Sequence, residues 1–148
     1  MSQPKVFRLL GGAALLLGTV GLNHALFVVG AILLAGGLGP IGARFGPDLA
    51  VTVLITSLLW TVAFLGLITV GFGLLGIRAW VIRPARWLAL YSMVMGLAEF
   101  TTGWVNAAGA PLRLGLAELA PALVLIGFSL GLAAAATRCH DYASRLRA

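Results

Sequence analysis

Charged side chains are scarce in this chain, and their scarcity excludes a water-soluble fold. Asp, Glu, Lys and Arg make up 9% of the 148 residues, whereas soluble domains carry about one quarter. Hydrophobic residues make up 61% of the chain instead. We therefore expect an all-α integral membrane protein, and the length leaves room for one domain over residues 1–148.

Cysteine is nearly absent as well, and the motifs of common cofactor sites are missing. The single cysteine, Cys139, excludes an intramolecular disulfide and any CxxC motif. The chain has no phosphate-binding loop, nucleophile elbow or acidic cluster. His24, Asp48, Glu99 and Glu118 are suitable metal ligands, but no HxxxH or ExxH spacing supports a site. We expect no metal and no cofactor.

Apolar residues gather in four stretches, each long enough to cross a bilayer, which takes about 20 residues. The stretches run over about residues 9–38, 49–77, 87–108 and 116–137, with clusters of Gly, Pro or Arg between them. The first exceeds the apolar core of a signal peptide, so we expect it to remain as a span. The pattern predicts a four-helix transmembrane bundle.

Basic residues are distributed unevenly about the predicted bundle. One side carries Lys5, Arg8, Arg78, Arg83, Arg86, Arg138, Arg145 and Arg147, and the other carries Arg44 and Arg113. The positive-inside rule then places both termini in the cytoplasm. Because these residues are spread over several loops, nucleic acid is not an expected partner. The Ala-, Gly-, Leu- and Arg-rich composition is typical of GC-rich bacteria, which favours the bacterial inner membrane.

The two halves of the chain resemble each other faintly. Gly-Leu-Asn-His at 21–24 has a counterpart in Gly-Leu-Ala-Glu at 96–99, and Asp-Leu-Ala at 48–50 has one in Glu-Leu-Ala at 118–120. One interpretation is a tandem duplication of a two-helix unit, for which transporters give precedent. The other is chance, because such dipeptides are common in this composition. A duplication would pair His24 with Glu99 and Asp48 with Glu118.

Glu99 is the clearest ionisable residue inside a predicted span. It lies about 20 Å beyond Arg86 along the helix, past the midplane. Such groups are costly in lipid, so they usually face a bundle interior and mark function. Its helical face also carries Ser92, Met95, Gly96, Thr102, Gly103 and Asn106. We expect this face to point into the bundle; the alternative is a protonated Glu99 that bonds a neighbouring helix for packing specificity.

The other polar candidates have structural alternatives. His24 lies about 24 Å beyond Arg8, and its alternative is a core histidine that hydrogen-bonds across helices. Asn23 faces a different neighbour and is equally suited to bonding between helices. Asp48 directly follows Pro47. Glu118 precedes Pro121, which is an alternative start for the fourth span. In that interpretation both acids stand near helix starts.

These residues all belong to the outer half of the predicted bundle, which predicts a polar pocket there. We assign candidate catalytic roles to Glu99, His24 and Glu118. Candidate substrate-binding residues are Asn23, Thr102, Asn106, Arg113, Asp48 and Trp104.

Three functions fit this pocket. The first is an intramembrane acid–base enzyme, of isomerase, cyclase or hydrolase type, acting on a lipophilic substrate with Glu99 as the acid. The second is an accessory subunit or lipid-binding module, within a homo-oligomer or a larger membrane complex. The third is a proton-coupled transporter of small molecules. The expected partners are the lipid bilayer and a lipophilic small molecule.

Overall fold

The computed structural model describes residues 3–45, 47–107 and 112–146, and its regular elements there are all helical. Side chains are described except at 41–42, 44–50 and 102–119. The elements are α1 (Gln3–Leu34), α2 (Leu38–Phe45), α3 (Pro47–Leu75), the 3₁₀ turn η1 (Ala79–Val81), α4 (Ile82–Ala107) and α5 (Leu112–Arg145). The expected all-α class is therefore confirmed.

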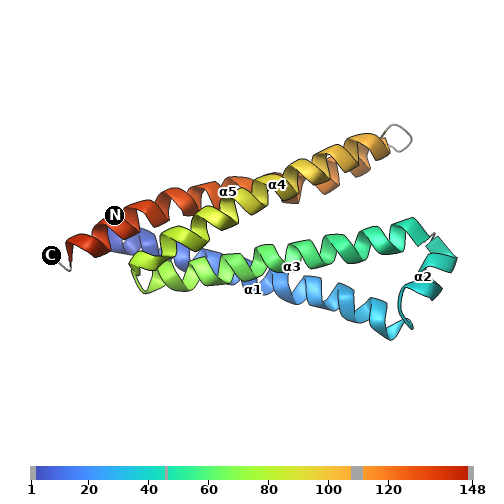
Figure 1. The fold of residues 1–148 in the computed structure, drawn as a ribbon, viewed down its shortest axis with the longest axis horizontal. Coiled ribbons are helices and arrows are strands. Elements are labelled where there is room, and N and C mark those ends of the chain that lie inside the picture. Colours follow the sequence, from blue (N-terminus) through green and yellow to red (C-terminus); the bar gives the residue numbers. More distant parts are fainter. Residues whose placement is uncertain (1–2, 46, 108–111, 147–148) are drawn as a thin grey trace.

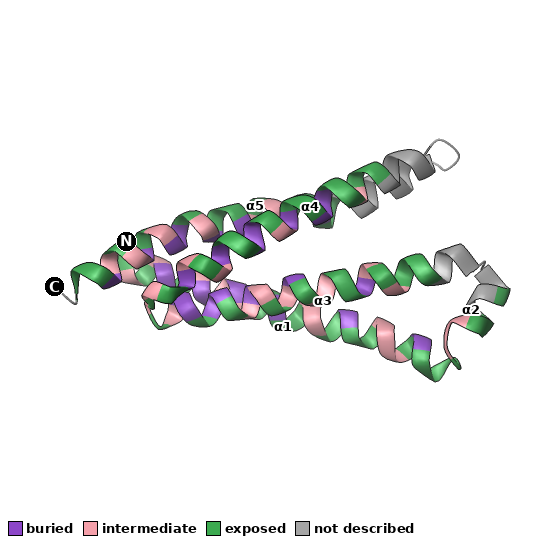
Figure 2. Cartoon of the chain, in the orientation of Figure 1, coloured by how far each residue is buried: buried purple, intermediate pink, exposed green. Residues whose placement is uncertain are grey.

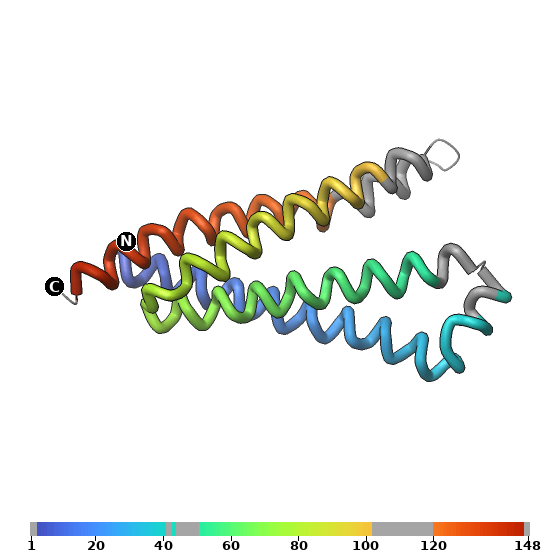
Figure 3. The backbone as a smooth tube through the Cα atoms, in the orientation of Figure 1, coloured from blue at the N-terminus to red at the C-terminus, as the bar shows by residue number. Residues whose placement is uncertain are grey.

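The four long helices form two antiparallel hairpins. Helix α1 packs mainly against α3, and α4 packs mainly against α5. The hairpins meet at the end that carries both termini and η1, and they diverge toward the end that carries α2 (Figure 1). We call these the terminal end and the splayed end. The smooth trace in Figure 3 shows the same divergence of the two hairpins away from the terminal end.

Three helical segments are long and apolar enough to cross a membrane. They are Gln3–Leu34, Val51–Leu75 and Ala120–Arg145. Their outer faces are largely exposed, as Figure 2 shows, and they carry large apolar side chains such as Leu16, Phe27 and Val124. Soluble monomers rarely expose apolar patches beyond a few hundred Å². Lipid is the natural cover for such a surface.

Buried residues recur along the helices at steps of three or four, or of seven, which is one of each. In α5 they are Ala122, Leu125, Ser129, Leu132, Ala136, Cys139 and Ala143, with Ala135 also buried beside Ala136. In α1 they are Phe7, Gly11, Ala14, Gly18, Ala25 and Ile32. A mean step of 3.5 residues keeps one seam facing the partner helix at a shallow crossing angle. The hairpins are therefore packed in the manner of coiled coils.

The seam between α1 and α3 is a backbone-to-backbone contact. A Cβ built on Gly11 would lie 2.9 Å from the carbonyl oxygen of Gly71, and one on Gly18 would lie 2.9 Å from that of Phe64. Small residues allow this close approach between helices in lipid. The glycines of α1 thus pack the first hairpin.

The terminal end holds the best-buried side chains. Leu74 of α3, Val81 of η1 and Cys139 of α5 are each 0% exposed. His140 Nδ1 lies 3.0 Å from the carbonyl oxygen of Ala79, which ties α5 to the connection between the hairpins. The ring of Phe7 meets that of Tyr142 edge to face at 6.1 Å. All four long helices are joined in this region.

The first helix ends earlier than the sequence predicts. The apolar pattern predicts a span that continues to about Leu38, but α1 stops at Leu34. Gly36 and Gly37 follow with φ of 87° and 89°, and Gly37 N–H donates to the carbonyl of Ile32 at 3.0 Å. This Schellman motif caps the helix, and left-handed backbone is cheap for glycine. The short helix α2 then occupies what the sequence presented as a break.

Pro121 does not begin the last helix. Helix α5 starts at Leu112 and passes through Pro121 without interruption, so Glu118 stands six residues inside it rather than at its start. Interior proline is tolerated in membrane helices because neighbouring groups compensate for the lost hydrogen bond. Asp48, by contrast, does lie in the first turn of α3, which begins at Pro47.

Candidate functional site

The central feature of the site is a contact between Trp60 of α3 and Glu99 of α4. The indole Nε1–H of Trp60 donates a hydrogen bond of 2.8 Å to Glu99 Oε1. Glu99 lies about 26 Å from the start of α4 at about 1.5 Å per residue, and its side chain is half-buried. Tryptophan buried among apolar groups needs an acceptor for its N–H. The contact therefore fixes the carboxyl group between the two hairpins.

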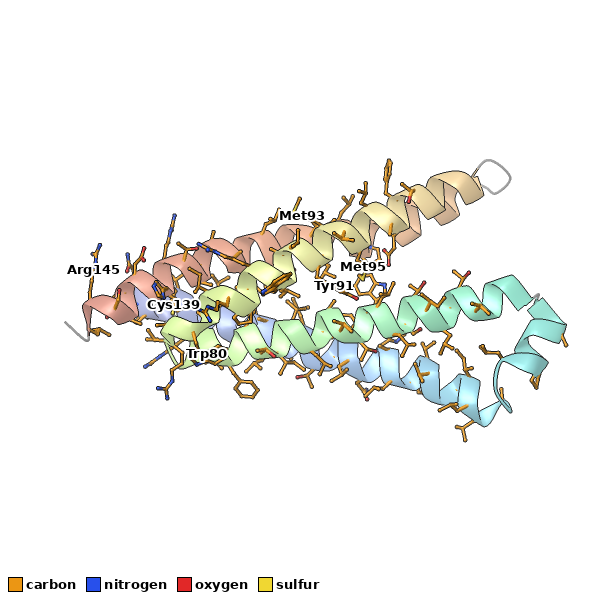
Figure 4. The ribbon with its side chains drawn as sticks, in the orientation of Figure 1. Trp80, Tyr91, Met93, Met95, Cys139 and Arg145 are labelled. Carbon is orange, nitrogen blue, oxygen red and sulfur yellow. The ribbon has the colours of Figure 1, made fainter. Side chains whose placement is uncertain are left out.

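A second hydrogen bond crosses between the same helices. The hydroxyl of Tyr91 donates to the backbone carbonyl of Leu59 at 2.7 Å. Leu59 immediately precedes Trp60, so the two bonds stand close together along α3. Figure 4 shows Tyr91 directed from α4 toward α3, whereas Met93 lies on the opposite side of its helix. The two bonds leave α4 about 12 Å apart, at about 1.5 Å per residue, and converge on adjacent residues of α3.

Aromatic packing connects Trp60 to the first helix. The rings of Trp60 and Phe64 lie 5.4 Å apart between centroids, tilted by 30°. Phe64 in turn covers Gly21 of α1, where any Cβ would collide with the Phe64 ring. Gly21, Phe64, Trp60 and Glu99 thus form a continuous line through α1, α3 and α4.

The described part of the polar face of α4 points into the molecule, as the helical periodicity predicts. Ser92 and Met95 are 1% and 4% exposed, and the Ser92 and Ser129 hydroxyl oxygens lie 3.0 Å apart across the α4–α5 seam. Gly96 is buried beneath the side chain of Ile126. Glu99 is next along this face, one turn closer to the splayed end.

The face of α3 that packs against α4 becomes exposed toward the splayed end. Gly73 lies under Val81 and Gly66 lies under Leu88. Seven-residue steps along the same face lead next to Leu59, which is 39% exposed, and to Thr52, which is exposed. Glu99 therefore stands where close packing between the hairpins gives way to exposed surface.

The structure does not bring His24 or Asn23 to Glu99. Both side chains are exposed on α1, and within the described residues α1 makes no backbone contact with α4. The pairing of His24 with Glu99 that a duplication would set up is therefore not a contact. Two hairpins in succession are the arrangement that a duplication requires, but an ordinary up-and-down bundle has it too.

The remaining candidate side chains lie outside those that the structure describes. They are Thr102, Asn106, Arg113, Asp48, Glu118 and Trp104. Among the described residues, no group of three or more His, Cys, Asp or Glu side chains is placed to hold a metal ion.

Trp60 is the site residue that the sequence analysis missed. Its position in an uninterrupted apolar run is a usable signal, because a tryptophan away from the interfacial belts needs a partner for its N–H. Tyr91 carries the same signal for its hydroxyl. Neither signal says which helix supplies the partner.

The arrangement offers an oriented carboxyl group beside aromatic rings. The indole is a neutral donor, so it positions the carboxyl without neutralising a negative charge. A carboxyl so placed accepts hydrogen bonds from hydroxyl or ammonium groups, and aromatic faces suit an apolar or cationic neighbour. Comparisons with known protein families, with curated proteins and with solved structures found no match for this chain.

Proposed function

We propose that the protein binds a lipophilic molecule in the splayed half of its membrane domain, with Glu99 as the polar anchor. The observation that carries this is the Trp60–Glu99 hydrogen bond of 2.8 Å, which holds a carboxyl group where the hairpins diverge. Ligand sites are commonly apolar with a few precisely placed polar groups. The chemistry at Glu99 favours a long-chain molecule that ends in a hydroxyl or amine.

Binding accounts for the geometry better than catalysis does. Acid–base catalysis needs proton-transferring groups within hydrogen-bond reach of the reacting atoms. His24, one of the expected partners of Glu99, lies on a helix without backbone contact to α4 in the described residues. An anchor for a ligand, in contrast, needs one oriented polar group and apolar surroundings, and Trp60 and Glu99 provide these.

Photolabelling tests the proposal directly. The probes are a long-chain alkylamine and the matching alcohol, each carrying a diazirine near the polar end. Both should label peptides around Trp60 and Glu99 of the protein in membranes. Glu99→Leu should lose both labels, whereas Glu99→Gln should keep the alcohol and lose most of the amine, because the amide accepts a hydrogen bond but carries no charge.

Leu97→Ala is the matched control, since Leu97 is 65% exposed on the same helix. It should label like the unmodified protein. Equal labelling of Glu99→Leu and the unmodified protein would exclude Glu99 as the anchor.

An acid–base enzyme of isomerase, cyclase or hydrolase type is the second candidate, because Trp60 holds the Glu99 carboxyl in one orientation, as proton transfer requires. Incubation with a total bacterial lipid extract, followed by mass spectrometry, should then reveal a converted lipid. Glu99→Gln should abolish conversion while it still binds the alcohol probe. Conversion that persists in this variant would exclude Glu99 as the catalytic acid, whereas no conversion by the unmodified protein would speak against the enzyme and leave the binding proposal intact.

We also propose four spans, with α4 as the additional one and both termini on the cytoplasmic side of a bacterial inner membrane. Helix α4 has 26 residues and lies antiparallel to α5, and this length suffices for a crossing. Arg83 and Arg138 are exposed at the terminal end, as the positive-inside rule requires of a cytoplasmic face. In a Cys139→Ala background, Ser144→Cys should react with an impermeant maleimide in inside-out vesicles and stay unlabelled in right-side-out ones.

A further inference from the structure

The outward side of α1 carries polar side chains within a membrane span. Asn23 and His24 belong to the span Gln3–Leu34, and both are exposed. Within the described part of the chain, neither side chain has a hydrogen-bond partner. In hydrocarbon an unsatisfied polar group is costly, and helices in lipid commonly satisfy one another through such groups. The surface around Asn23 is therefore suited to contact with another helix.

Asn23 lies in the middle of a strip that follows one side of α1. Its members, at steps of three and four residues, are Leu9, Gly12, Leu16, Thr19, Asn23, Phe27, Gly30 and Leu34. We call this the Asn23 strip. A Cβ built on Gly12 or Gly30 would meet nothing within 4 Å, so the strip is uncovered by the rest of the chain. Its spacing matches the contact seam of two helices that cross at a shallow angle.

We propose that the Asn23 strip packs against the same strip of a second copy of the protein. Two copies in one membrane share an orientation, so a two-fold axis along the membrane normal brings every residue to the depth of its counterpart. A carboxamide both donates and accepts hydrogen bonds, so two Asn23 side chains satisfy each other. Thr19 has the same property through its hydroxyl group. The strip carries no charge that would oppose pairing of identical copies.

An uncovered face of α5 lacks this self-complementarity. On α5, Gly127 and Gly131 also leave open space. The exposed residues of α5 between 120 and 134 are all apolar, however. Lipid chains can cover an apolar face without leaving a hydrogen-bonding group unsatisfied. The Asn23 strip carries such groups, and this distinguishes α1 as the dimer contact.

Cysteine crosslinking in native membranes tests the geometry. In a Cys139→Ala background, Leu16→Cys places a thiol on the strip and Leu17→Cys places one about 100° away around the helix. The two leucines are adjacent and are 66% and 47% exposed. With copper–phenanthroline as the oxidant, Leu16→Cys should give a disulfide-linked dimer and Leu17→Cys should give little. Val124→Cys reports the rival face on α5 and should give little as well.

Changing the polar group itself tests the cause. Asn23→Leu should weaken dimerisation about five- to thirty-fold, the factor that one interhelical asparagine hydrogen bond supplies in lipid, and single-molecule photobleaching in bilayers measures it. Asn23→Gln should restore part of the loss. Because Asn23 is exposed, the helix content by circular dichroism should stay unchanged. Equal crosslinking at positions 16 and 17, stronger crosslinking at 124, or an unchanged dimer fraction for Asn23→Leu would overturn the proposal.

Discussion

The two ends of the molecule are held together in different ways. At the terminal end, side chains from all four long helices interlock, and Leu74, Val81 and Cys139 are 0% exposed. Toward the splayed end, none of the described residues 51–56 of α3 is buried, and each hairpin depends on its own seam. Trp60 and Tyr91 make the hydrogen bonds that link the hairpins between these regions.

This difference assigns stability to the terminal end and conformational adaptability to the splayed end. Regions with dense apolar packing carry most of the unfolding free energy, whereas binding and movement are drawn from sparsely packed regions. A bundle joined at one end lets its other end adjust to a bound molecule without unfolding. The predictions below test this division, beginning with the most tightly packed seam.

Gly11→Ala should be the most damaging of these single changes. Its Cβ would meet the backbone of Gly71 at 2.9 Å, and a backbone cannot rotate away as a side chain can. Such overpacking costs about 2 kcal/mol of unfolding free energy. Gly127→Ala is the control, because nothing lies within 4 Å of its Cβ position, and it should gain up to about 1 kcal/mol from helix propensity. Unfolding in mixed SDS micelles measures both, and equal stability of the two variants would contradict the close-packed seam.

Ser129→Ala should rank next. It leaves the buried Ser92 hydroxyl without its partner at 3.0 Å, at a cost of about 1–2 kcal/mol in unfolding free energy. The double variant Ser92→Ala/Ser129→Ala should be less damaging than the sum of the single ones, because no hydroxyl is then stranded. Strict additivity in the same micelle assay would mean that the two serines do not interact.

The sequence predicts the elements of this fold better than their arrangement. Helical character and the interior-facing side of α4 follow from composition and a period near 3.6 residues, and Ser92 and Met95 are buried as that period requires. The divergence of the hairpins depends on which side chains meet between helices. Periodicity within one helix does not predict which side chains of another helix it will meet. For this reason Glu99 is found from the sequence alone, whereas its bond to Trp60 is not.

Proline rules fail for a related reason. The rule that places proline at a helix start comes from chains in water, where a broken helix finds other hydrogen-bond partners. In lipid an interrupted helix exposes backbone groups that have no such partners, so α5 continues through Pro121. The position of Glu118 inside α5 follows from the solvent rather than from local propensity.

Trp60→Phe should widen the range of distances between the hairpins at the splayed end, with only a small loss of unfolding free energy. It removes the indole N–H from Glu99 but keeps an aromatic ring against Phe64, at a cost of about 1 kcal/mol. Spin labels at Leu58 and Leu123, in a Cys139→Ala background, should show a broader distance distribution than in the Trp60-containing protein. A label pair at Phe72 and Ala134, nearer the terminal end, should be unchanged. Equal broadening at both levels would mean that the ends are not independent.

Tyr91→Phe should have the smallest effect, and its size bears on which bond orients the site. The hydroxyl of Tyr91 donates to the Leu59 carbonyl at 2.7 Å, but that carbonyl keeps its bond within α3, and the Tyr91 ring keeps its packing against the core. The loss should therefore be about 0.5–1 kcal/mol of unfolding free energy. Labelling by the long-chain alcohol probe should persist, because Glu99 retains Trp60. If labelling falls as far as in Glu99→Leu, the Tyr91–Leu59 bond between α4 and α3, rather than the indole N–H of Trp60, positions the Glu99 carboxyl group.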